Sequence, residues 1–348
     1  MSRILRLLAI VVVALAAAWS GAWFLVAGMI ETRVGGWAEA QRAQGTRVAF
    51  GGIAVDGFPM RWRLVATDYE IAREGPAPHV LRGARFEALI VPWDLATVPL
   101  RLPGPQHLER RGAGGAQDYA LRIEAERPDA VLRLAPDGRA RAIDLDFGGV
   151  TASVPKTPFL VTAARLRVAV AETDPPDPRT REFLTLAFDA EDLVLPHAVA
   201  LPLEPTIRAV RLELALRGER ATRGTPAERV AAWRESGGVL ELLRLDLDWA
   251  PLRVSGDGTA ALDARNRPQA ALALRIAGHQ ELIDILVRTR RLPAPQAAIF
   301  RTLAAGMARP DPATGRTEIV LPVTAQDGRL SIAGFPVAPL PPIALPSP

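Results

Sequence analysis

A long apolar run at the start of the chain limits how the rest can fold. Leu7 to Ile30 is a run of 24 residues without a charged side chain, and Arg3 and Arg6 precede it. At about 1.5 Å per residue, a helix of this length can cross a bilayer core of about 30 Å. Basic residues before such a span favour keeping that end in the cytoplasm. The sequence predicts a short cytoplasmic segment over 1–6, a membrane anchor over 7–30 and a body beyond the membrane.

A cleaved secretory signal is the alternative interpretation of this run. Small residues at Ala16–Ala18 and Ser20–Ala22 form patterns that a signal peptidase accepts. The apolar run continues past both patterns, however, and exceeds the roughly 7–15 residues of a signal core. Trp19 and Trp23 lie near its outer end, where indole side chains favour the membrane interface. These features favour an uncleaved anchor, and under either interpretation the body is exported.

The composition excludes several classes of protein. The chain has 348 residues and no cysteine, which excludes disulfides, thiolate metal sites and thiol redox chemistry. With 49% hydrophobic and 23% charged residues, it has the composition of a folded chain. The net charge is only +4, and arginines are interleaved with acidic residues along the chain. Because nucleic-acid-binding proteins concentrate positive charge on one face or in one run, nucleic acid is not expected as a partner.

From residue 46 onward, alternating apolar and polar residues bounded by Gly or Pro predict strands. The predicted strands are Thr46–Val55, Met60–Ile71, Val80–Val91, Asp118–Glu126, Ala130–Ala135, Ala140–Phe147, Leu160–Ala171, Phe183–Leu195, Thr206–Arg217, Val239–Trp249, Ala270–Ala277, Glu318–Thr324 and Leu330–Gly334. We therefore expect a mainly β body over 46–335 with a few helices, an α+β chain. Its sheet would be an extended, curved antiparallel sheet, or an open sandwich or barrel-like body.

Helical spacing and capping residues predict helices that flank or interrupt this sheet. The predicted helices cover 31–45 beside the membrane, 226–235, 278–292 and 295–307. Thr225 is a suitable N-cap for the second of these, with proline at its first position. The tail over 336–348 is rich in proline and is predicted to be extended without regular structure.

The strands have a strongly apolar face. In Leu243–Trp249, every odd position is apolar and every even position is charged. One face of such a strand meets an apolar interior and the other meets water. A filled core and an open groove for acyl chains give the same alternation, so both interpretations stay open.

The sequence offers few residues for catalysis. Its histidines, at positions 79, 107, 197 and 279, are far apart and are interpreted as surface or loop residues. The acidic pairs Glu124/Glu126, Asp144/Asp146 and Asp246/Asp248 lie two residues apart, so each pair points to one solvated face of a strand. Gly256–Gly258 is interpreted as a turn between strands, and no nucleophile elbow or phosphate-binding loop is present. We expect no catalytic, metal-binding or cofactor-binding residues and predict that the protein is not an enzyme.

A Gly-Phe-Pro tripeptide occurs twice, at Gly57, Phe58 and Pro59 and again at Gly334, Phe335 and Pro336. At the end of a strand, this sequence suggests a glycine that bends the chain, a phenylalanine that plugs the core and a proline that stops pairing. Arg61 and Trp62 follow the first copy. These residues are interpreted as structural rather than functional.

The segment from Gly57 to Arg63, with its Gly-Phe-Pro-x-Arg motif, resembles the bacterial family called domain of unknown function 2125. Members of that family similarly combine an N-terminal span, a Trp-containing helix, here around Trp37, and this motif. The resemblance covers most of the chain and implies no activity and no catalytic residues. More loosely, Val254–Leu292 looks like AsmA-type proteins of the bacterial envelope, which implies a role in lipid handling or outer-membrane assembly.

These observations lead to one preferred function and one alternative. The preferred function is that of a single-pass protein of the bacterial inner membrane, with a periplasmic body that binds or guides lipid without catalysing a reaction. The alternative is an envelope scaffold with a filled β core, which binds a protein partner through strand edges or the proline-rich tail.

Overall fold

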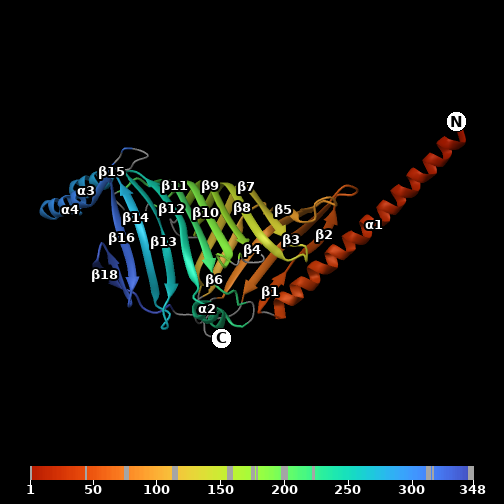
Figure 1. Ribbon diagram of the computed structural model, residues 1–348. Coiled ribbons are helices and arrows are strands. Elements are labelled where there is room, and N and C mark those ends of the chain that lie inside the picture. Colours follow the sequence, from red (N-terminus) through yellow and green to blue (C-terminus); the bar gives the residue numbers. More distant parts are fainter. Residues whose placement is uncertain are drawn as a thin grey trace. The chain divides into compact units, whose positions relative to one another are not determined.

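The computed structural model describes residues 2–43, 45–73, 78–111, 117–154, 160–173, 177, 179–196, 203–221, 224–310, 315 and 317–343 (Figure 1). The described residues form four helices and 18 strands, and the strands pair in an antiparallel manner. This confirms the expected mainly β architecture with an N-terminal apolar helix. The chain divides into two compact units, Met1–Ala140 (unit 1) and Arg141–Pro348 (unit 2).

Unit 1 begins with helix α1 (Ser2–Ala43), which is long and apolar enough to cross a membrane. The predicted anchor over 7–30 and the predicted juxtamembrane helix over 31–45 belong to this one helix, because no proline interrupts it. After the helix, Gly45 adopts a φ of +78° and its N–H donates to the carbonyl of Arg42 at 3.1 Å. A glycine with positive φ thus follows the helix, as the sequence suggested.

Seven strands complete unit 1. They are β1 (Thr46–Ala49), β2 (Gly52–Asp56), β3 (Trp62–Arg73), β4 (His79–Ile90), β5 (Thr97–Arg101), β6 (Gln106–Arg111) and β7 (Gln117–Leu134). β3 pairs with β4, while β1 and β2 pair with opposite halves of the other edge of β3. β5 and β6 likewise share the space between β4 and β7.

Two predictions of strand boundaries in unit 1 were wrong, because one expected strand is divided in two and two expected strands are joined. Thr46–Val55 was expected as a single strand but is divided into β1 and β2 at Gly51, whose N–H donates to the carbonyl of Thr67 at 2.9 Å. Asp118–Glu126 and Ala130–Ala135 were expected as two strands but form the continuous β7. Pro128 stays within β7, where its missing N–H does not end the strand.

Unit 2 holds the remaining strands and three helices. The strands are β8 (Ala140–Ser153), β9 (Leu160–Glu172), β10 (Glu182–Val194), β11 (Thr206–Arg217), β12 (Val239–Trp249), β13 (Leu252–Leu262), β14 (Pro268–Ala277), β15 (Ala308–Pro310), β16 (Thr317–Gln326), β17 (Arg329–Ile332) and β18 (Phe335–Pro339). The strands from β8 to β14 pair in sequence order, and β14 then pairs with β16, β16 with β17 and β17 with β18.

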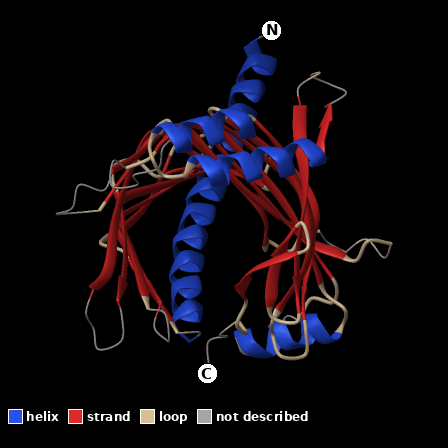
Figure 2. Cartoon of the chain, turned by 90° about the vertical axis from the view of Figure 1, so that its left-hand side faces the viewer, coloured by secondary structure: helices blue, strands red, loops and turns tan. Residues whose placement is uncertain are grey.

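The helices of unit 2 lie close to the predicted ranges. Helix α2 (Pro226–Glu235) starts at Thr225, whose side chain and that of Glu228 form a capping box. Helices α3 (His279–Arg288) and α4 (Ala294–Met307) lie side by side, as Figure 2 shows. The guanidinium of Arg301 on α4 pairs with Asp284 on α3 at 2.6 Å.

Two other expectations for unit 2 were wrong. Gly256–Gly258 was interpreted as a turn but lies within β13, where glycine allows the neighbouring strand to approach closely. A Cβ on Gly258 would lie 2.4 Å from the carbonyl oxygen of Ala271 on β14. The tail was expected to lack regular structure, but its first residues belong to β18, which pairs with β17. Residues 344–348 lie outside the described residues.

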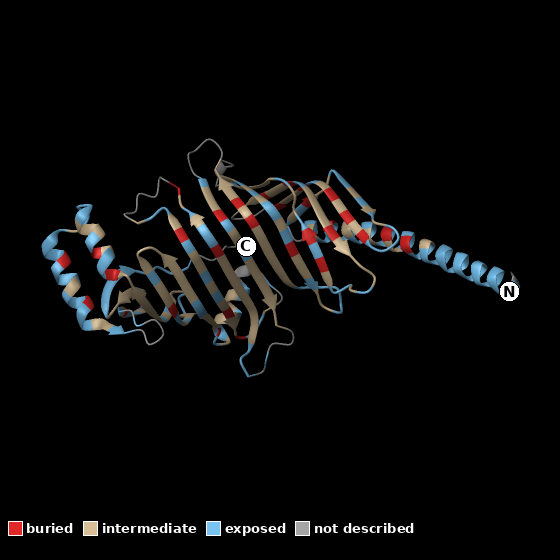
Figure 3. Cartoon of the chain, turned by 90° about the horizontal axis from the view of Figure 1, so that it is seen from above, coloured by how far each residue is buried: buried red, intermediate tan, exposed pale blue. Residues whose placement is uncertain are grey.

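Burial differs between the two units. Figure 3 shows buried positions scattered along strands that are mostly of intermediate exposure, and an exposed N-terminal half of α1. In unit 1, the buried set includes large side chains such as Trp23, Trp62, Leu64 and Tyr69. In unit 2, the described strands bury mainly alanines, among them Ala190 and Ala215. The large apolar side chains of unit 2 therefore keep contact with solvent more often than those of unit 1.

Candidate functional site: an anchor junction and an apolar sheet face

The Gly-Phe-Pro-x-Arg motif forms the turn between β2 and β3. Gly57 has a φ of +101°, a conformation that side chains rarely adopt. A Cβ at this position would lie 2.9 Å from both the carbonyl oxygen and the Cγ atom of Arg61. The N–H of Arg61 donates to the carbonyl of Gly57 at 3.3 Å, which closes the turn. Glycine is therefore required here by both backbone conformation and space.

This turn is where the sheet meets α1. The indole N–H of Trp19 donates to the carbonyl of Pro59 at 2.9 Å, and that of Trp23 donates to the carbonyl of Arg61 at 3.0 Å. In the reverse direction, the indole N–H of Trp62 donates to the carbonyl of Trp23 at 3.2 Å. Three indoles thus provide reciprocal hydrogen bonds between the helix and the turn, although the partners are 38 to 40 residues apart in sequence.

The aromatic rings of the junction also pack against one another. Trp23 stacks on Trp62 with ring centroids 6.5 Å apart, and only 3% and 6% of their surfaces are exposed. Phe58 meets Trp23 edge-on at 5.5 Å and stacks on Phe24 at 5.8 Å. Such aromatic pairs contribute about 0.5–1.5 kcal/mol each beyond their buried area. We call Trp19, Trp23, Phe24, Phe58 and Trp62 the anchor junction.

The junction corrects part of the sequence interpretation. Phe58 was expected to plug the core, but 48% of it is exposed because it packs on the outside of α1. Trp62 is the buried aromatic side chain of the motif. Trp23 is enclosed by protein whereas Trp19 is 41% exposed, and the predicted place of both at a membrane interface stays a prediction. The side chain of Arg61 is exposed.

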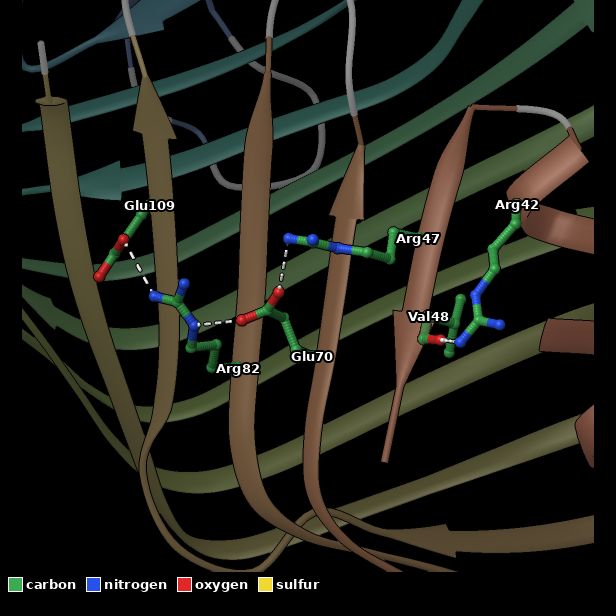
Figure 4. Close-up of polar contacts among 6 residues, drawn as sticks. All are labelled: Arg42, Arg47, Val48, Glu70, Arg82 and Glu109. Carbon is green, nitrogen blue, oxygen red and sulfur yellow. Dashed lines mark hydrogen bonds and ion pairs between the residues drawn. The ribbon is translucent and has the colours of Figure 1, made fainter. Parts of the chain in front are cut away.

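The C-terminal half of α1 makes two further hydrogen bonds to the sheet. A carboxylate oxygen of Glu31 accepts the backbone N–H of Val55 at 3.2 Å. The guanidinium of Arg42 donates to the carbonyl of Val48 at 3.1 Å (Figure 4). Val48 itself is buried. The helix is therefore fastened to β1, β2 and the motif turn from Trp19 to its end.

A row of alternating charges crosses the same sheet. Arg82 on β4 pairs with Glu70 on β3 at 2.8 Å and with Glu109 on β6 at 3.1 Å, and Glu70 also pairs with Arg47 on β1 at 3.1 Å (Figure 4). The hydrogen bond from Arg82 lowers the pKa of the Glu70 carboxyl below its usual value. Because each charge has an opposite neighbour on the adjacent strand, this face of unit 1 is electrostatically satisfied.

The second Gly-Phe-Pro sequence lies in a different setting. Gly334, with a φ of +83°, lies in the turn between β17 and β18, and open space surrounds it. Phe335 pairs with Ile332 and is largely exposed, so the prediction that it plugs the core was wrong. Pro336 is opposite Ser331 in β17. The two copies share a glycine with positive φ, and the aromatic side chain of the first packs against α1.

In unit 2, the apolar residues form continuous rows across the sheet. Strand register places one such row side by side on adjacent strands: Leu145, Val168, Phe188, Leu212, Leu245, Gly256, Leu274 and Leu321. The large side chains of this row are all half-buried. We call this surface the apolar face. Its large side chains keep partial contact with solvent, unlike the fully covered side chains of a conventional core.

Helix α2 covers one end of the apolar face. The indole N–H of Trp233 donates to the carbonyl of Arg217 at 2.8 Å. The Trp233 ring lies against Gly238, where an added Cβ would come within 2.3 Å of it. A cavity of about 580 Å³ lies between α2 and the strands, with Leu216, Leu240 and Ala260 among its apolar lining residues. We call it the α2 pocket.

Two arginines are among the residues that line the α2 pocket. Arg220 pairs with Glu172 through two contacts of 2.7 Å, which fixes its guanidinium. Arg229 on α2 is exposed. A pocket with an apolar lining and a few charged groups fits an amphiphile better than a fully polar ligand. Sequence reasoning predicted the alternating strands but did not identify Trp233 or this pocket.

The opposite face of the unit 2 sheet is polar. Asp246 pairs with Arg244 at 2.5 Å, and Asp248 pairs with Arg208 at 3.4 Å and with Arg253 at 3.7 Å. In the other acidic pairs, Glu124 contacts Arg122 and Asp146 contacts Arg165. Glu124, Asp146, Asp246 and Asp248 therefore each lie beside an arginine, as is typical of charged strand surfaces.

One histidine does not match its interpretation as a surface residue. His279, at the start of α3, is buried with 7% of its surface exposed, and neither ring nitrogen has a hydrogen-bond partner in the described structure. His79 and His107 are half-buried on β4 and β6, and His197 lies outside the described residues. Among the described residues, no group of three or more His, Asp or Glu side chains is arranged to hold a metal ion.

Comparisons with known proteins give one match. Neither the curated proteins nor the solved structures include one that matches this chain. A family model described as an uncharacterized protein conserved in bacteria matches residues 23–341. This range includes the anchor junction from Trp23 onward, the apolar face and the α2 pocket. The chain therefore belongs to the bacterial family called domain of unknown function 2125 (DUF2125).

Proposed function

We propose that this protein is anchored in the bacterial inner membrane by α1 and that its periplasmic body binds or guides lipid without catalysing a reaction. Arg3 and Arg6 favour a cytoplasmic N-terminus, which leaves the body on the periplasmic side. The role resembles that of AsmA-type envelope proteins. Membrane lipid is its partner in this proposal, and nucleic acid and cofactors are not involved.

The observation that carries this proposal is the open apolar face of unit 2. Large apolar side chains that stay half-buried lose part of the free energy that a filled core would provide. A ligand with acyl chains would remove this surface from water. The α2 pocket, at about 580 Å³, falls within the usual range of ligand pockets, about 300–1,000 Å³. Arg229 supplies a positive charge for an acidic lipid headgroup.

The test is retention of lipid by the full-length chain. The protein is purified in a mild detergent, and bound phospholipid is quantified by native mass spectrometry and after solvent extraction. Ala260→Trp introduces a bulky side chain into the lining of the α2 pocket, whereas Ala271→Trp introduces the same side chain at an exposed position of β14 on the opposite, polar face of the sheet. We expect the first variant to lose most of the retained phospholipid and the second to keep it.

The result that contradicts the proposal is equal lipid retention by the two variants, or a wild-type chain from which all phospholipid exchanges into detergent. Lipid that merely surrounds α1 would be retained equally by both variants, so it cannot imitate the expected result. Because Ala260→Trp could disturb the sheet, Ala260→Leu provides a smaller change at the same position. Circular dichroism establishes whether each variant keeps its strands.

A scaffold that binds an envelope protein is the second candidate function. Helix α4 exposes Ile299, Phe300 and Leu303, and β18 exposes Phe335 and Val337. Exposed apolar side chains on a helix and on a terminal strand of the sheet are typical of protein-binding surfaces. Crosslinking from these residues that recovers one stoichiometric envelope protein, from a chain that retains no lipid, would favour this function.

A further inference from the structure

The exposed apolar side chains of the unit 1 sheet gather in two turns. Among the described residues of unit 1 outside α1, the large hydrophobic side chains that are strongly exposed are Phe58, Met60, Trp93 and Leu95. Their exposed fractions are 48%, 60%, 69% and 60%, respectively. The first two belong to the β2–β3 turn and the others to the β4–β5 turn. We call these four residues the apolar tip.

The pairing of the strands places both turns at one end of the sheet. Asp56 pairs with Arg63 beside the first turn, and Trp62 pairs with Ile90 just before the second. The second turn is held in shape by the Asp94 carboxylate, which accepts the backbone N–H groups of Ala96 and Thr97 at 3.1 and 3.0 Å. This Asx arrangement fixes the backbone around Trp93 and Leu95, while their side chains stay exposed.

The length of α1 places this end of the sheet at the depth of the bilayer. Counting from Leu7, about 20 residues are needed to cross the hydrocarbon core, and these end at Val26. The sheet is already bonded to α1 at Trp19, only 12 residues after Leu7, which is about 18 Å along the helix. The anchor junction therefore begins before the helix has crossed a core of about 30 Å.

We propose that the apolar tip is inserted into the leaflet on the body's side of the membrane. This end of the unit 1 sheet then lies within the bilayer rather than above it. This inference rests on the proposed role of α1 as a membrane anchor. The partner is the bilayer itself: acyl chains surround Phe58, Met60, Trp93 and Leu95. The exposed guanidinium of Arg61 is next to the tip and can bind lipid phosphate.

Charge and burial at the two turns agree with this depth. The ion pair between Arg63 and Asp56, at 2.7 Å, comes directly after the tip along the sheet and is partly exposed. An exposed ion pair is favourable in the headgroup region and costly in the hydrocarbon core. The exposed indole ring of Trp93 favours the boundary between the two. Exposed side chains are thus apolar in the β2–β3 turn and charged at Asp56 and Arg63, the first residue pair after it.

The depth of the tip can be measured with single cysteines, because the chain has none of its own. Four variants of the full-length chain each carry an environment-sensitive NBD label: Ala14→Cys within α1, Met60→Cys and Trp93→Cys in the tip, and Glu126→Cys on the exposed surface of β7. Each is reconstituted into phosphatidylcholine and phosphatidylglycerol vesicles, with or without doxyl-labelled phosphatidylcholine. Aqueous iodide is the complementary quencher.

We expect doxyl lipid to quench the label at positions 14, 60 and 93, and iodide to quench the label at position 126. Labels at 60 and 93 that respond as at 126, while the label at 14 is quenched by lipid, would overturn the insertion of the tip alone. A label at 14 that escapes lipid quenching would overturn both the anchor and the inserted tip. The cysteines at 60, 93 and 126 replace exposed side chains, and circular dichroism checks that every variant retains its strands.

Discussion

The anchor junction of unit 1 and the apolar face of unit 2 use large apolar side chains in opposite ways. In the junction, Trp23 and Trp62 are buried and their indole N–H groups are bonded to backbone carbonyls. On the apolar face, Leu212, Leu245 and Leu274 lie in register on adjacent strands yet remain partly exposed. Close packing of large side chains is thus concentrated where α1 meets the sheet, and apolar surface stays available on the unit 2 sheet.

The largest expected effect follows from removing the central ring of the junction. Trp23→Ala deletes a buried indole, leaves a cavity beside Trp62 and removes the hydrogen bond to Arg61. Large-to-small changes of this kind cost about 3–5 kcal/mol. Denaturant unfolding of the full-length chain in micelles, followed by circular dichroism, measures the loss. Trp93→Ala is the matched control, because that indole is exposed and its loss should change stability by about 0.5 kcal/mol or less.

A smaller loss of stability is expected from a substitution in the turn between β2 and β3 that carries the Gly-Phe-Pro-x-Arg motif. Gly57→Ala introduces a Cβ at a φ of +101° and within 2.9 Å of Arg61, so we expect a cost of about 1–3 kcal/mol. Gly104→Ala isolates the effect of conformation, because Gly104 has a φ of +83° with nothing near its Cβ. The same unfolding measurement compares the two variants. Equal losses would show that the contact with Arg61 contributes nothing.

The third prediction compares leucines in the two units. Leu64→Ala on β3 removes a buried side chain and should cost about 2–5 kcal/mol, whereas Leu245→Ala on β12 should cost only about 1 kcal/mol because that side chain is half-buried. If the apolar face binds acyl chains, Leu245→Ala also lowers phospholipid retention in native mass spectrometry. A cost as large as that of Leu64→Ala would mean that the apolar face acts as a filled core.

The smallest expected effect concerns pH and the charge row of unit 1. The Glu70 carboxyl has a pKa below its ordinary value of 4.5, mainly because Arg82 donates a hydrogen bond to it. Folding thus favours the charged form, so the stabilisation is complete above pH 4.5 and is lost as the pH falls through the folded-state pKa. Glu70→Gln should remove the part of the free energy of unfolding that depends on the charge of Glu70. Because the pair is partly exposed, high salt should also weaken it.

That last prediction is checked by unfolding the wild type and Glu70→Gln between pH 3 and 7. The difference between the two curves should shrink toward acid pH. Glu126→Gln is a suitable control, because Glu126 is exposed on β7 and lies outside the charge row. A difference that stays constant over the whole range would contradict the assigned role of Arg82.

The sequence predicted local structure well where periodicity and capping are strong. Thr206–Arg217 and Val239–Trp249 match β11 and β12, and Pro226–Glu235 matches α2 with its capping box. It failed at Gly256–Gly258, which resembles a turn but lies within a strand. A glycine pair signals both a turn and a close approach of two backbones, and only the neighbouring strand distinguishes them.

The candidate sites could be predicted only in part. Trp19, Trp23 and the Gly57–Trp62 motif were each recognised in the sequence, but their mutual hydrogen bonds join residues 38 to 40 positions apart. Trp233 carried no signal, because its role depends on a helix that folds back over the apolar face. Contacts of this kind depend on the tertiary fold, which a one-dimensional pattern does not specify.

The sequence by itself determined a membrane-length apolar helix and an alternating β body, since length, hydropathy and a period of two residues act locally. Only the tertiary structure decided that the helix continues to Ala43 and is fastened to the Gly57 turn through three indoles. It also decided that the apolar face stays partly open. Alternation fixes which side chains share a face, whereas burial depends on what packs over that face.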